Sequence, residues 1–368
     1  MTTYTRIIHV LGALKAGGAE RFVVDLLVAQ KAMGLPVELA LLLPVRDRVG
    51  DGWASLLEHA GVPIRYGPSQ NFRPPTVMWL RTLLKQKDVD LVHIHLNYVE
   101  AAYYLARFAH RRHYKVCRTI HNMSPPEPGL WNWAFHHSDI RDSISCGEGC
   151  HEAYQSLAKG SLTCIPYGVN FDWPTHDPAR RDERQRALGL DPAFTHYMQV
   201  GRQTGDSVPT MQKAQDDLIK AWRQAELGAK GGRLHLIGEG ALQAELEALA
   251  AGDDTIIFEG VKNNVHEWFA ACDTHVMPSR FEGLPLAGIE SVGTGIPAVF
   301  TDIPPLRELD SRVALFSEVG DIDALGANLE DRLGKRDSES PEHVAALRER
   351  FGIGLCARRY SEVYDRLS

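Results

Sequence analysis

Two glutamates, Glu282 and Glu290, stand eight residues apart in the stretch 279–295, which reads SRFEGLPLAGIESVGTG. A carboxylate accepts hydrogen bonds from two hydroxyls at once, so such a pair suits a polyol such as a sugar or a ribose. The apolar run 274–278 before them is typical of a strand, and Pro285 is typical of the first turn of a helix. A turn between them leaves free backbone N–H groups at a positive helix end, where an anion can bind. The stretch therefore indicates a sugar-nucleotide site, although two glutamates near a surface helix are often only solvated charges.

The residues around the two glutamates favour the first of these interpretations. The segments 283–285 (GLP) and 293–297 (GTGIP) resemble the signature of the retaining glycosyltransferases of family 4. In that family E-G-hydrophobic-P/G-hydrophobic and E-x7-E precede a G-x-P strand entry. The resemblance implies that Glu290 holds the ribose hydroxyls and that Glu282 contacts the transferred sugar. It extends the donor site to Gly283, Leu284, Pro285 and Leu286.

Length and composition are those of a soluble globular protein with more than one core. The 368 residues are too many for one ordinary hydrophobic core, so two domains are expected. Hydrophobic residues make up 44% and charged residues 24% of the chain. No apolar run reaches the ~20 residues of a membrane span, and residues 1–8 contain no secretory apolar region. We therefore expect a cytoplasmic protein, either free or at the inner face of the plasma membrane.

Charge and cysteine content argue against two kinds of binding site. The net charge of −7 argues against a general nucleic-acid binder. The cysteines lack zinc-finger or redox spacing, so we interpret them as buried reduced thiols. They are Cys117, Cys146, Cys150, Cys164, Cys272 and Cys356.

The charge is unevenly distributed along the chain. Residues 1–170 carry 18 Lys and Arg against 14 Asp and Glu, whereas residues 171–368 carry 22 against 33. Two segments of the positive half, 72–81 and 107–112, combine basic and aromatic residues. Such helices can lie on anionic bilayers, although an ordinary solvated helix face is an equal alternative. We expect a peripheral contact with an acidic surface, either an anionic acceptor or a membrane that carries a lipid-linked acceptor.

Strand-like and helix-like segments alternate throughout the first half. The strand 6–11, the glycine-rich loop 12–18 and the helix 19–29 are typical of the start of a doubly wound α/β domain. This alternation predicts a parallel sheet covered on both faces, with ligands at the carboxyl ends of its strands. Further strands are expected at 37–43, 62–66, 90–95, 115–120, 139–146 and 162–168, and helices at 53–60, 76–84, 98–111 and 148–155.

The glycine loop adds a second resemblance to family 4. A loop of this kind is weak evidence by itself, because flexible loops are also rich in glycine. Residues 17–21 (GGAER), however, match the opening of many members of the family. The resemblance implies that Gly17 and Gly18 face the donor phosphates and the acceptor across a cleft.

Polar side chains stand at the ends of two strands of the first half. His93 and His95 flank one apolar residue, so they point to the same face of their strand, and His121 with Asn122 follows the next strand. The T-x-H-[DN] pattern recurs in family 4, which implies that His121 lies near the transferred sugar and that His95 and Asn122 line the acceptor side. A zinc site from His93, His95 and His121 lacks an Asp, Glu or Cys at supporting spacing, so no metal site is expected.

The second half supplies the residues expected at the donor diphosphate. Arg202 follows the strand-like run 197–201 and resembles the G-R of the family. In the family a lysine that begins K-G follows within about five residues. Here Lys213 comes only after ten intervening residues, and Ala214 replaces the glycine. We expect the strand end to hold Arg202 rigidly and the loop to let Lys213 reach the donor only after ordering. By the same resemblance Glu239 follows another strand and Val261 lies near the base.

These features predict a GT-B fold, with two facing Rossmann-like doubly wound domains at 1–172 and 173–350 and a C-terminal helix, 351–368, that crosses back to the first. The resemblance implies a hexosyltransferase that moves a sugar from a nucleotide-diphosphate sugar, UDP in the first instance, to an acceptor hydroxyl with retention. No cofactor or metal is expected, and the setting would be cell-surface polysaccharide, lipopolysaccharide or glycolipid synthesis. Three alternatives stay open: a sugar-nucleotide epimerase or hydrolase, a dinucleotide-dependent oxidoreductase, and a non-catalytic binding module.

Overall fold

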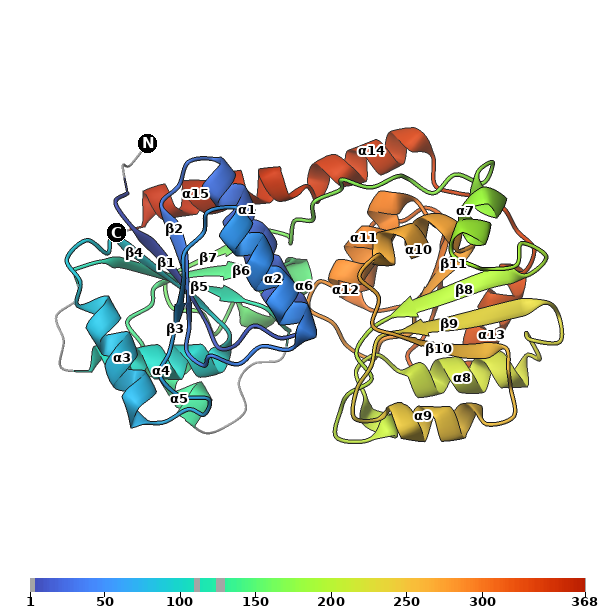
Figure 1. Ribbon diagram of the computed structural model, residues 1–368, viewed down its shortest axis with the longest axis horizontal. Helices are drawn as coiled ribbons and strands as arrows, with labels where there is room; N and C mark the ends of the chain where they lie inside the picture. The colour runs from blue at the N-terminus through green and yellow to red at the C-terminus, as the bar shows by residue number, and fades with distance from the viewer. Residues whose placement is uncertain (1–3, 109–112, 124–129, 368) are drawn as a thin grey trace. The chain divides into compact units, whose positions relative to one another are not determined.

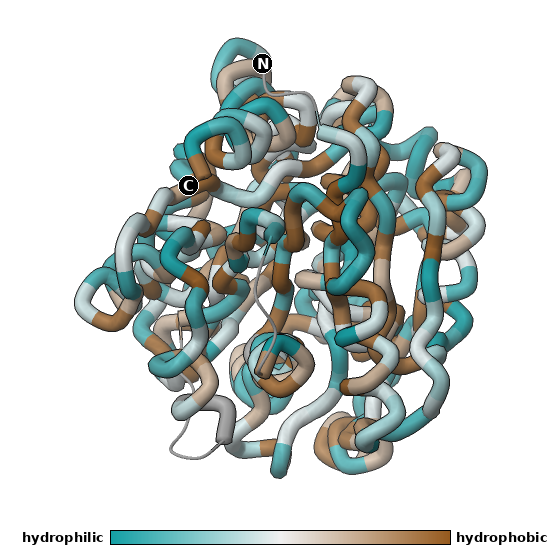
Figure 2. The backbone as a smooth tube through the Cα atoms, turned by 90° about the vertical axis from the view of Figure 1, so that its left-hand side faces the viewer, coloured by the Kyte–Doolittle hydropathy of each residue, from teal (hydrophilic) through white to brown (hydrophobic). Residues whose placement is uncertain are grey.

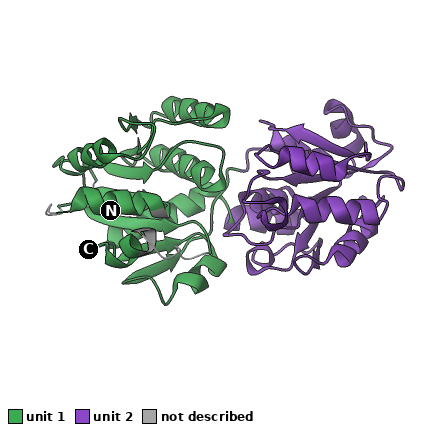
Figure 3. Cartoon of the chain, turned by 90° about the horizontal axis from the view of Figure 1, so that it is seen from below, with its two compact units in different colours: residues 1–170, 351–368 green, residues 171–350 purple. Residues whose placement is uncertain are grey.

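The computed structural model describes residues 4–108, 113–123 and 130–367. It divides into two compact units, shown in Figure 3: unit 1 comprises residues 1–170 with 351–368, and unit 2 comprises residues 171–350. The division after residue 170 lies two residues before the boundary that the sequence predicts after residue 172.

Within the described residues, unit 1 contains a seven-stranded parallel sheet in the order β3-β2-β1-β4-β5-β6-β7. The inner strand β1 is completely buried, because helices cover both faces of the sheet. In Figure 1, α1 and α15 lie on one face, and α3, α4 and α5 lie on the other. The strands are β1 (Ile7–Leu11), β2 (Val37–Leu41), β3 (Ile64–Tyr66), β4 (Leu91–His95), β5 (Lys115–Ile120), β6 (Asp142–Ser145) and β7 (Ser161–Cys164). The helices are α1 (Gly18–Ala32), α2 (Arg48–His59), α3 (Pro74–Leu84), α4 (Asn97–Arg107), α5 (Leu130–His137), α6 (Glu148–Tyr154) and α15 (Ile353–Arg366).

Unit 2 repeats this architecture with a six-stranded parallel sheet in the order β10-β9-β8-β11-β12-β13. The helices α8, α9 and α13 pack on one face, around the fully buried Trp222. The strands are β8 (Thr195–Val200), β9 (Gly232–Ile237), β10 (Ile256–Gly260), β11 (Thr274–Met277), β12 (Ala298–Thr301) and β13 (Ala314–Ser317). The helices are α7 (Arg181–Ala187), η1 (Val208–Thr210), α8 (Gln215–Gln224), α9 (Gln243–Ala250), α10 (Val265–Ala271), α11 (Leu286–Thr294), α12 (Pro304–Arg307), α13 (Ile322–Asp331) and α14 (Pro341–Arg350).

The two parallel-sheet domains expected from the alternating pattern are confirmed. Figure 2 shows hydrophobic and hydrophilic residues mixed along the helices, as expected for helices with one face on a sheet. The tail 341–367 is two helices, α14 and α15, and α15 lies within the C-terminal helix expected at 351–368. They are interrupted at Phe351 and Gly352, where Gly352 has extended backbone angles. The Phe351 carbonyl accepts from Val169 N at 2.8 Å, and Ile353 N donates to the Val169 carbonyl at 3.0 Å. This pairing replaces helical hydrogen bonds and begins the return of the chain to unit 1.

Candidate functional site

The stretch with the two glutamates lies where the strand order of unit 2 reverses. Strands β8 and β11 are neighbours in the sheet. The chain continues from β8 to β9 on one side of this pair and from β11 to β12 on the other. Ligands of open α/β sheets bind at the carboxyl ends of the strands at such a point. Arg202 follows β8, and the turn 278–285 joins β11 to α11. The sheet therefore brings together two segments that are about eighty residues apart in the sequence.

Glu282 is held inside this turn by two side chains of one distant segment. Its exposed fraction is only 5%. Lys213 Nζ donates to Glu282 Oε1 at 2.7 Å, and Gln212 Nε2 donates to Oε2 at 3.0 Å. The carboxylate thus has a donor on each oxygen, and the pair of charges is largely shielded from water. Gln212 has no expected role in the sequence; only its position beside Lys213 could have singled it out.

The long loop 203–213 is attached to the turn by further hydrogen bonds. Arg280 N donates to the Gln212 carbonyl at 2.9 Å, and Arg280 Nη1 donates to the Met211 carbonyl at 2.8 Å. Gln212 Nε2 also donates to the Phe281 carbonyl at 3.0 Å. These contacts hold the loop against the turn in this structure, whereas the sequence left the order of the loop to the donor.

Arg202 also differs from expectation. It is exposed, and within the described residues its guanidinium forms no ion pair. Lys213, by contrast, is fixed against Glu282 and passes close to Gly201, where a β-carbon would lie 3.0 Å from Lys213 Cγ. The rigidly held cation of the site is therefore the lysine, while the arginine side chain extends into solvent.

The backbone at Ala214 explains why a glycine was expected after the lysine. Ala214 is the N-cap of α8 and adopts the left-handed angles φ 48° and ψ 40°. Only glycine adopts this conformation without a penalty from the β-carbon. The chain keeps the local geometry of the K-G pattern and accepts some strain.

The remaining donor residues occupy the same edge of unit 2. Gly283, Leu284 and Pro285 are buried, and Leu286, the first residue of α11, is half-buried. Glu290 is half-buried in α11, and its carbonyl accepts from Thr294 Oγ1 at 2.7 Å. Glu239 follows β9 and Val261 follows β10, and both side chains are exposed. These roles stay predictions, since no bound donor marks them.

The glycine loop of unit 1 begins a helix as expected. Gly17 is the N-cap of α1 and Gly18 its first residue, with Gly18 exposed. A β-carbon at Gly17 would overlap the Glu20 carboxylate, which folds back over the first turn. The Glu20 carboxylate therefore lies at the positive end of α1, where a donor phosphate is expected. Phosphate binding at this helix end stays a prediction.

The histidines at the strand ends of unit 1 are bonded to the protein itself. His121 is half-buried, with Nε2 3.1 Å from His95 Nδ1 and with Nδ1 bonded to the Tyr167 hydroxyl. Burial lowers the pKa of His121 to about 3, so its ring is neutral. Both ring nitrogens of His121 are occupied, whereas Asn122 beside it is exposed.

His95 cannot line an acceptor surface as expected, because it is completely buried. Its second nitrogen, Nε2, lies 3.0 Å from Nδ1 of His9 on β1. His9 had no expected role in the sequence, although a histidine within the apolar run IIHVL is itself unusual. His9 pairs with His93 in the register of β1 and β4, so the strand order brings the two rings together.

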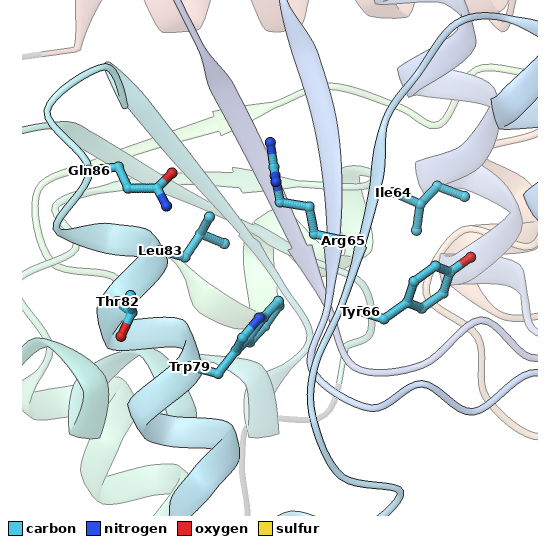
Figure 4. Close-up of a pocket in the computed structure, with 7 residues that line it drawn as sticks. All are labelled: Ile64, Arg65, Tyr66, Trp79, Thr82, Leu83 and Gln86. Atoms are coloured by element: carbon cyan, nitrogen blue, oxygen red, sulfur yellow. The ribbon is translucent and has the colours of Figure 1, made fainter.

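A shallow cavity of about 330 Å³ lies at the other edge of unit 1, between β3 and α3 (Figure 4). Trp79 and Leu83 project from the helix side, and Arg65 and Tyr66 belong to the strand side. Phe72 and Met78 nearby in sequence are exposed.

No helix in the described parts of the chain is long and apolar enough to cross a bilayer.

Two family models match the chain: Glycosyltransferase Family 4 over residues 16–172 and Glycosyl transferases group 1 over residues 203–334. The lipopolysaccharide core biosynthesis mannosyltransferase LpsB of Rhizobium meliloti (strain 1021) is 27% identical over 354 residues, which are 92% of this chain and 95% of LpsB. A GDP-mannose-dependent alpha-(1-6)-phosphatidylinositol dimannoside mannosyltransferase of Mycobacterium tuberculosis (strain ATCC 25177 / H37Ra) is 30% identical over 171 residues, 46% of this chain and 43% of that one. Among solved structures, Anabaena Alr3699/HepE in complex with UDP and glucose matches with a TM-score of 0.79 at 18% identity, covering 98% of this chain and 99% of that chain.

Proposed function

Because the chain belongs to the glycosyltransferases of the family 4 type and has their GT-B fold, we propose that it transfers a hexose from a nucleoside-diphosphate sugar to an acceptor hydroxyl with retention of anomeric configuration. The observation that carries this proposal is the Lys213–Glu282 pair beside the start of α11, at the switch point of the unit 2 sheet. That arrangement combines a cation, free helix N–H groups and a carboxylate, which suit a diphosphate and the hydroxyls of a sugar.

The reaction breaks the bond between C1 of the sugar and the leaving phosphate oxygen and forms a bond from C1 to the acceptor oxygen. The acceptor proton passes to the phosphate that leaves. Charge grows on that phosphate as the bond lengthens, through an oxocarbenium-like state. Lys213, Arg202 and the N–H groups at the start of α11 stabilise this charge in place of a metal ion. Glu282 contacts the sugar, and Glu290 accepts from the ribose hydroxyls.

UDP was the first expectation for the donor base, and a mannosyl donor is a second candidate. LpsB, which matches along nearly the whole chain, is named a mannosyltransferase, and the Mycobacterium tuberculosis relative is named GDP-mannose-dependent. These two names favour GDP-mannose over UDP-hexoses, because the UDP-bound neighbour shares only 18% identity. The proposed acceptor is a sugar of a lipopolysaccharide or glycolipid.

A panel of donors with defined acceptors tests the proposal. Mass spectrometry of the products from UDP-, GDP- and TDP-sugars identifies the donor, and NMR of the product identifies the anomer. Transfer that occurs with inversion, or release of free sugar regardless of acceptor, contradicts the proposal and favours the epimerase or hydrolase alternative. Turnover that disappears in EDTA and returns with manganese contradicts the metal-independent mechanism.

Donor binding also gives a direct test of Glu290. Glu290→Ala removes a carboxylate that would hold two ribose hydroxyls, so nucleotide affinity should fall by ~2–4 kcal/mol. Glu290→Asp is the matched control, because it keeps the charge and retains part of the affinity. Unchanged nucleotide affinity of Glu290→Ala in calorimetry would show that the ribose lies elsewhere.

We further propose a peripheral contact of unit 1 with an anionic membrane that carries the acceptor. The exposed Phe72, Met78 and Phe108 support it. The basic residues support it less, since Arg107 pairs with Asp139 at 2.6 Å and Arg81 donates to two carbonyls at the C-terminal end of α4. Residues 109–112 of the second basic segment lie outside the described part. Sedimentation with anionic vesicles at low salt tests the contact, and no binding there removes it.

A further inference from the structure

Eight side chains in the core of unit 1 form one continuous line of hydrogen bonds, here called the buried relay. Its members, in order, are Tyr167, His121, His95, His9, Tyr364, His93, Thr119 and Tyr360. Six of them lie on or just after the strands β1, β4, β5 and β7 and two lie on α15, and all but His121 are buried. The relay therefore links the end of β5 with the C-terminal helix.

The first part of the relay runs across the sheet. His121 Nε2 lies 3.1 Å from His95 Nδ1, and His95 Nε2 lies 3.0 Å from His9 Nδ1. The second part passes through α15. Tyr364 Oη lies 3.4 Å from His9 Nε2 and 2.7 Å from His93 Nδ1. Each imidazole thus uses both ring nitrogens within the relay.

The far end of the relay is a pair of hydroxyls. His93 Nε2 lies 2.8 Å from Thr119 Oγ1, which lies 3.2 Å from the Tyr360 hydroxyl. A hydroxyl can either donate or accept, so this end imposes no direction on the hydrogen bonds.

All four imidazoles of the relay are neutral. Burial lowers the pKa of His9 and of His121 to about 3, and burial together with the neighbouring imidazoles lowers the pKa of His93 and of His95 well below the usual range. A neutral imidazole has one N–H and one lone pair. Each ring must therefore donate on one side and accept on the other, which forces a single direction along the directly bonded rings His121, His95 and His9.

Tyr364 carries the direction of the relay from His9 to His93. Its oxygen accepts from Gln30 Nε2 at 3.2 Å, so its own proton goes either to His93 Nδ1 at 2.7 Å or to His9 Nε2 at 3.4 Å. The shorter contact favours His93 Nδ1, which leaves the His93 proton on Nε2. His9 Nε2 then has no donor from Tyr364, and it is satisfied only when it carries a proton and donates to the Tyr364 oxygen.

We propose that the buried relay locks its four imidazoles in the Nε2–H tautomer and thereby orients His121, with His9, His95 and Tyr364 as positioning residues. In this state the Tyr167 hydroxyl donates to His121 Nδ1, and every later donor points toward Thr119. The contribution of the relay to turnover rests on the proposed function and on the role that the family resemblance implies for His121 beside the transferred sugar.

A metal ion is the competing use of the same rings. His9, His93 and His95 offer nitrogen atoms within 4.8 Å of one another. An ion there would need the lone pairs that the relay already uses, and no carboxylate of the described residues joins this group to offset the charge. The short His9–His95 hydrogen bond favours the relay.

NMR of the full chain labelled with ¹⁵N-histidine tests the relay without reference to activity. Long-range ¹⁵N–¹H correlations report the tautomers, and scalar couplings across N–H···N bonds report the contacts of His95 with His121 and with His9. We expect Nε2–H in all four rings and both couplings. A relay ring with Nδ1–H, or the absence of both couplings, overturns the proposal, as does stoichiometric Zn²⁺ uptake that removes these N–H signals.

The Tyr364→Phe variant tests the positioning role, since it keeps the ring and removes the central hydroxyl. We expect kcat to fall by about tenfold with the donor KM unchanged, which is the lower end of the loss when the outer partner of a metal-bound imidazole is removed, and the His93 tautomer to become mixed. Tyr103→Phe is the matched control. Tyr103 is a fully buried tyrosine of the same unit, and its hydroxyl donates to Asp139 at 3.2 Å, outside the relay. The control should keep kcat and the histidine signals.

The outcomes separate this proposal from the proposed function. Equal kcat for Tyr364→Phe and Tyr103→Phe overturns the positioning role. Failure of the NMR test with transferase activity intact overturns the relay alone, whereas lack of transfer with the expected NMR pattern overturns the proposed function alone. If Tyr364→Phe does not fold, Thr119→Val removes the hydroxyl bonded to His93 and carries the same expectations.

Discussion

The Lys213–Glu282 pair makes a quantitative prediction about the stability of unit 2. Lys213→Met removes the ammonium and keeps an unbranched apolar stem beside Gly201. It leaves a carboxylate that is 5% exposed with Gln212 as its remaining side-chain donor. Removing one partner of a buried pair costs ~3–5 kcal/mol. Because 19% of the Lys213 side chain is exposed, water partly screens the pair, and we expect a loss of ~2–3 kcal/mol in the free energy of unfolding.

A double-mutant cycle isolates the pair itself. Glu282→Gln in the Lys213→Met background removes the unpaired charge, so the double variant should recover most of the loss and give a coupling of ~2 kcal/mol. Urea denaturation followed by tryptophan fluorescence measures the cycle, because Trp222 is fully buried in the core of unit 2. Lys220→Met is the control. Lys220 also pairs with a carboxylate, Asp216 at 2.8 Å, but it is 45% exposed, so its loss should cost less than ~1 kcal/mol. A coupling below ~0.5 kcal/mol would refute the assignment of a shielded pair.

Three further perturbations follow from the geometry. Ala214→Gly should stabilise the chain by ~1 kcal/mol, because glycine adopts the left-handed angles of this position without strain; a lower thermal midpoint would contradict this. His275 is buried with neither ring nitrogen hydrogen-bonded within the described residues, so His275→Leu should leave the stability unchanged or raise it, whereas a loss above ~2 kcal/mol would indicate a hidden partner. Acid should destabilise unit 1, because the pKa values of the relay imidazoles are lowered in the native chain. The unfolded chain therefore takes up protons below pH 6.5, whereas the native chain does not. The contribution of the neutral imidazoles to the free energy of unfolding is present above that pH, and as much as ~4 kcal/mol of it is lost between pH 6.5 and 5.5. A urea midpoint that does not change between those pH values would contradict this assignment.

The sequence predicted the elements whose pattern is local. The alternation of apolar runs with amphipathic segments indicated two parallel sheets, and both are present. The turn before Pro285 and the start of α11 also lie where the residue types placed them. Helices and turns follow from backbone preferences within a few residues, which a sequence displays directly. Even the missing glycine at Ala214 was visible, although its left-handed backbone was not.

Side-chain partners across the sheets depended on the strand order, which the sequence does not display. Lys213 meets Glu282 only because β8 and β11 are neighbours, and His9 meets His95 only because β1 lies beside β4. The sequence therefore indicated a mobile lysine and a rigid arginine, whereas packing holds the lysine and leaves Arg202 exposed. Local chemistry determined which residues could act, and the long-range order of the parallel strands decided which of them meet, since that order is set by the burial of whole sheets and helices.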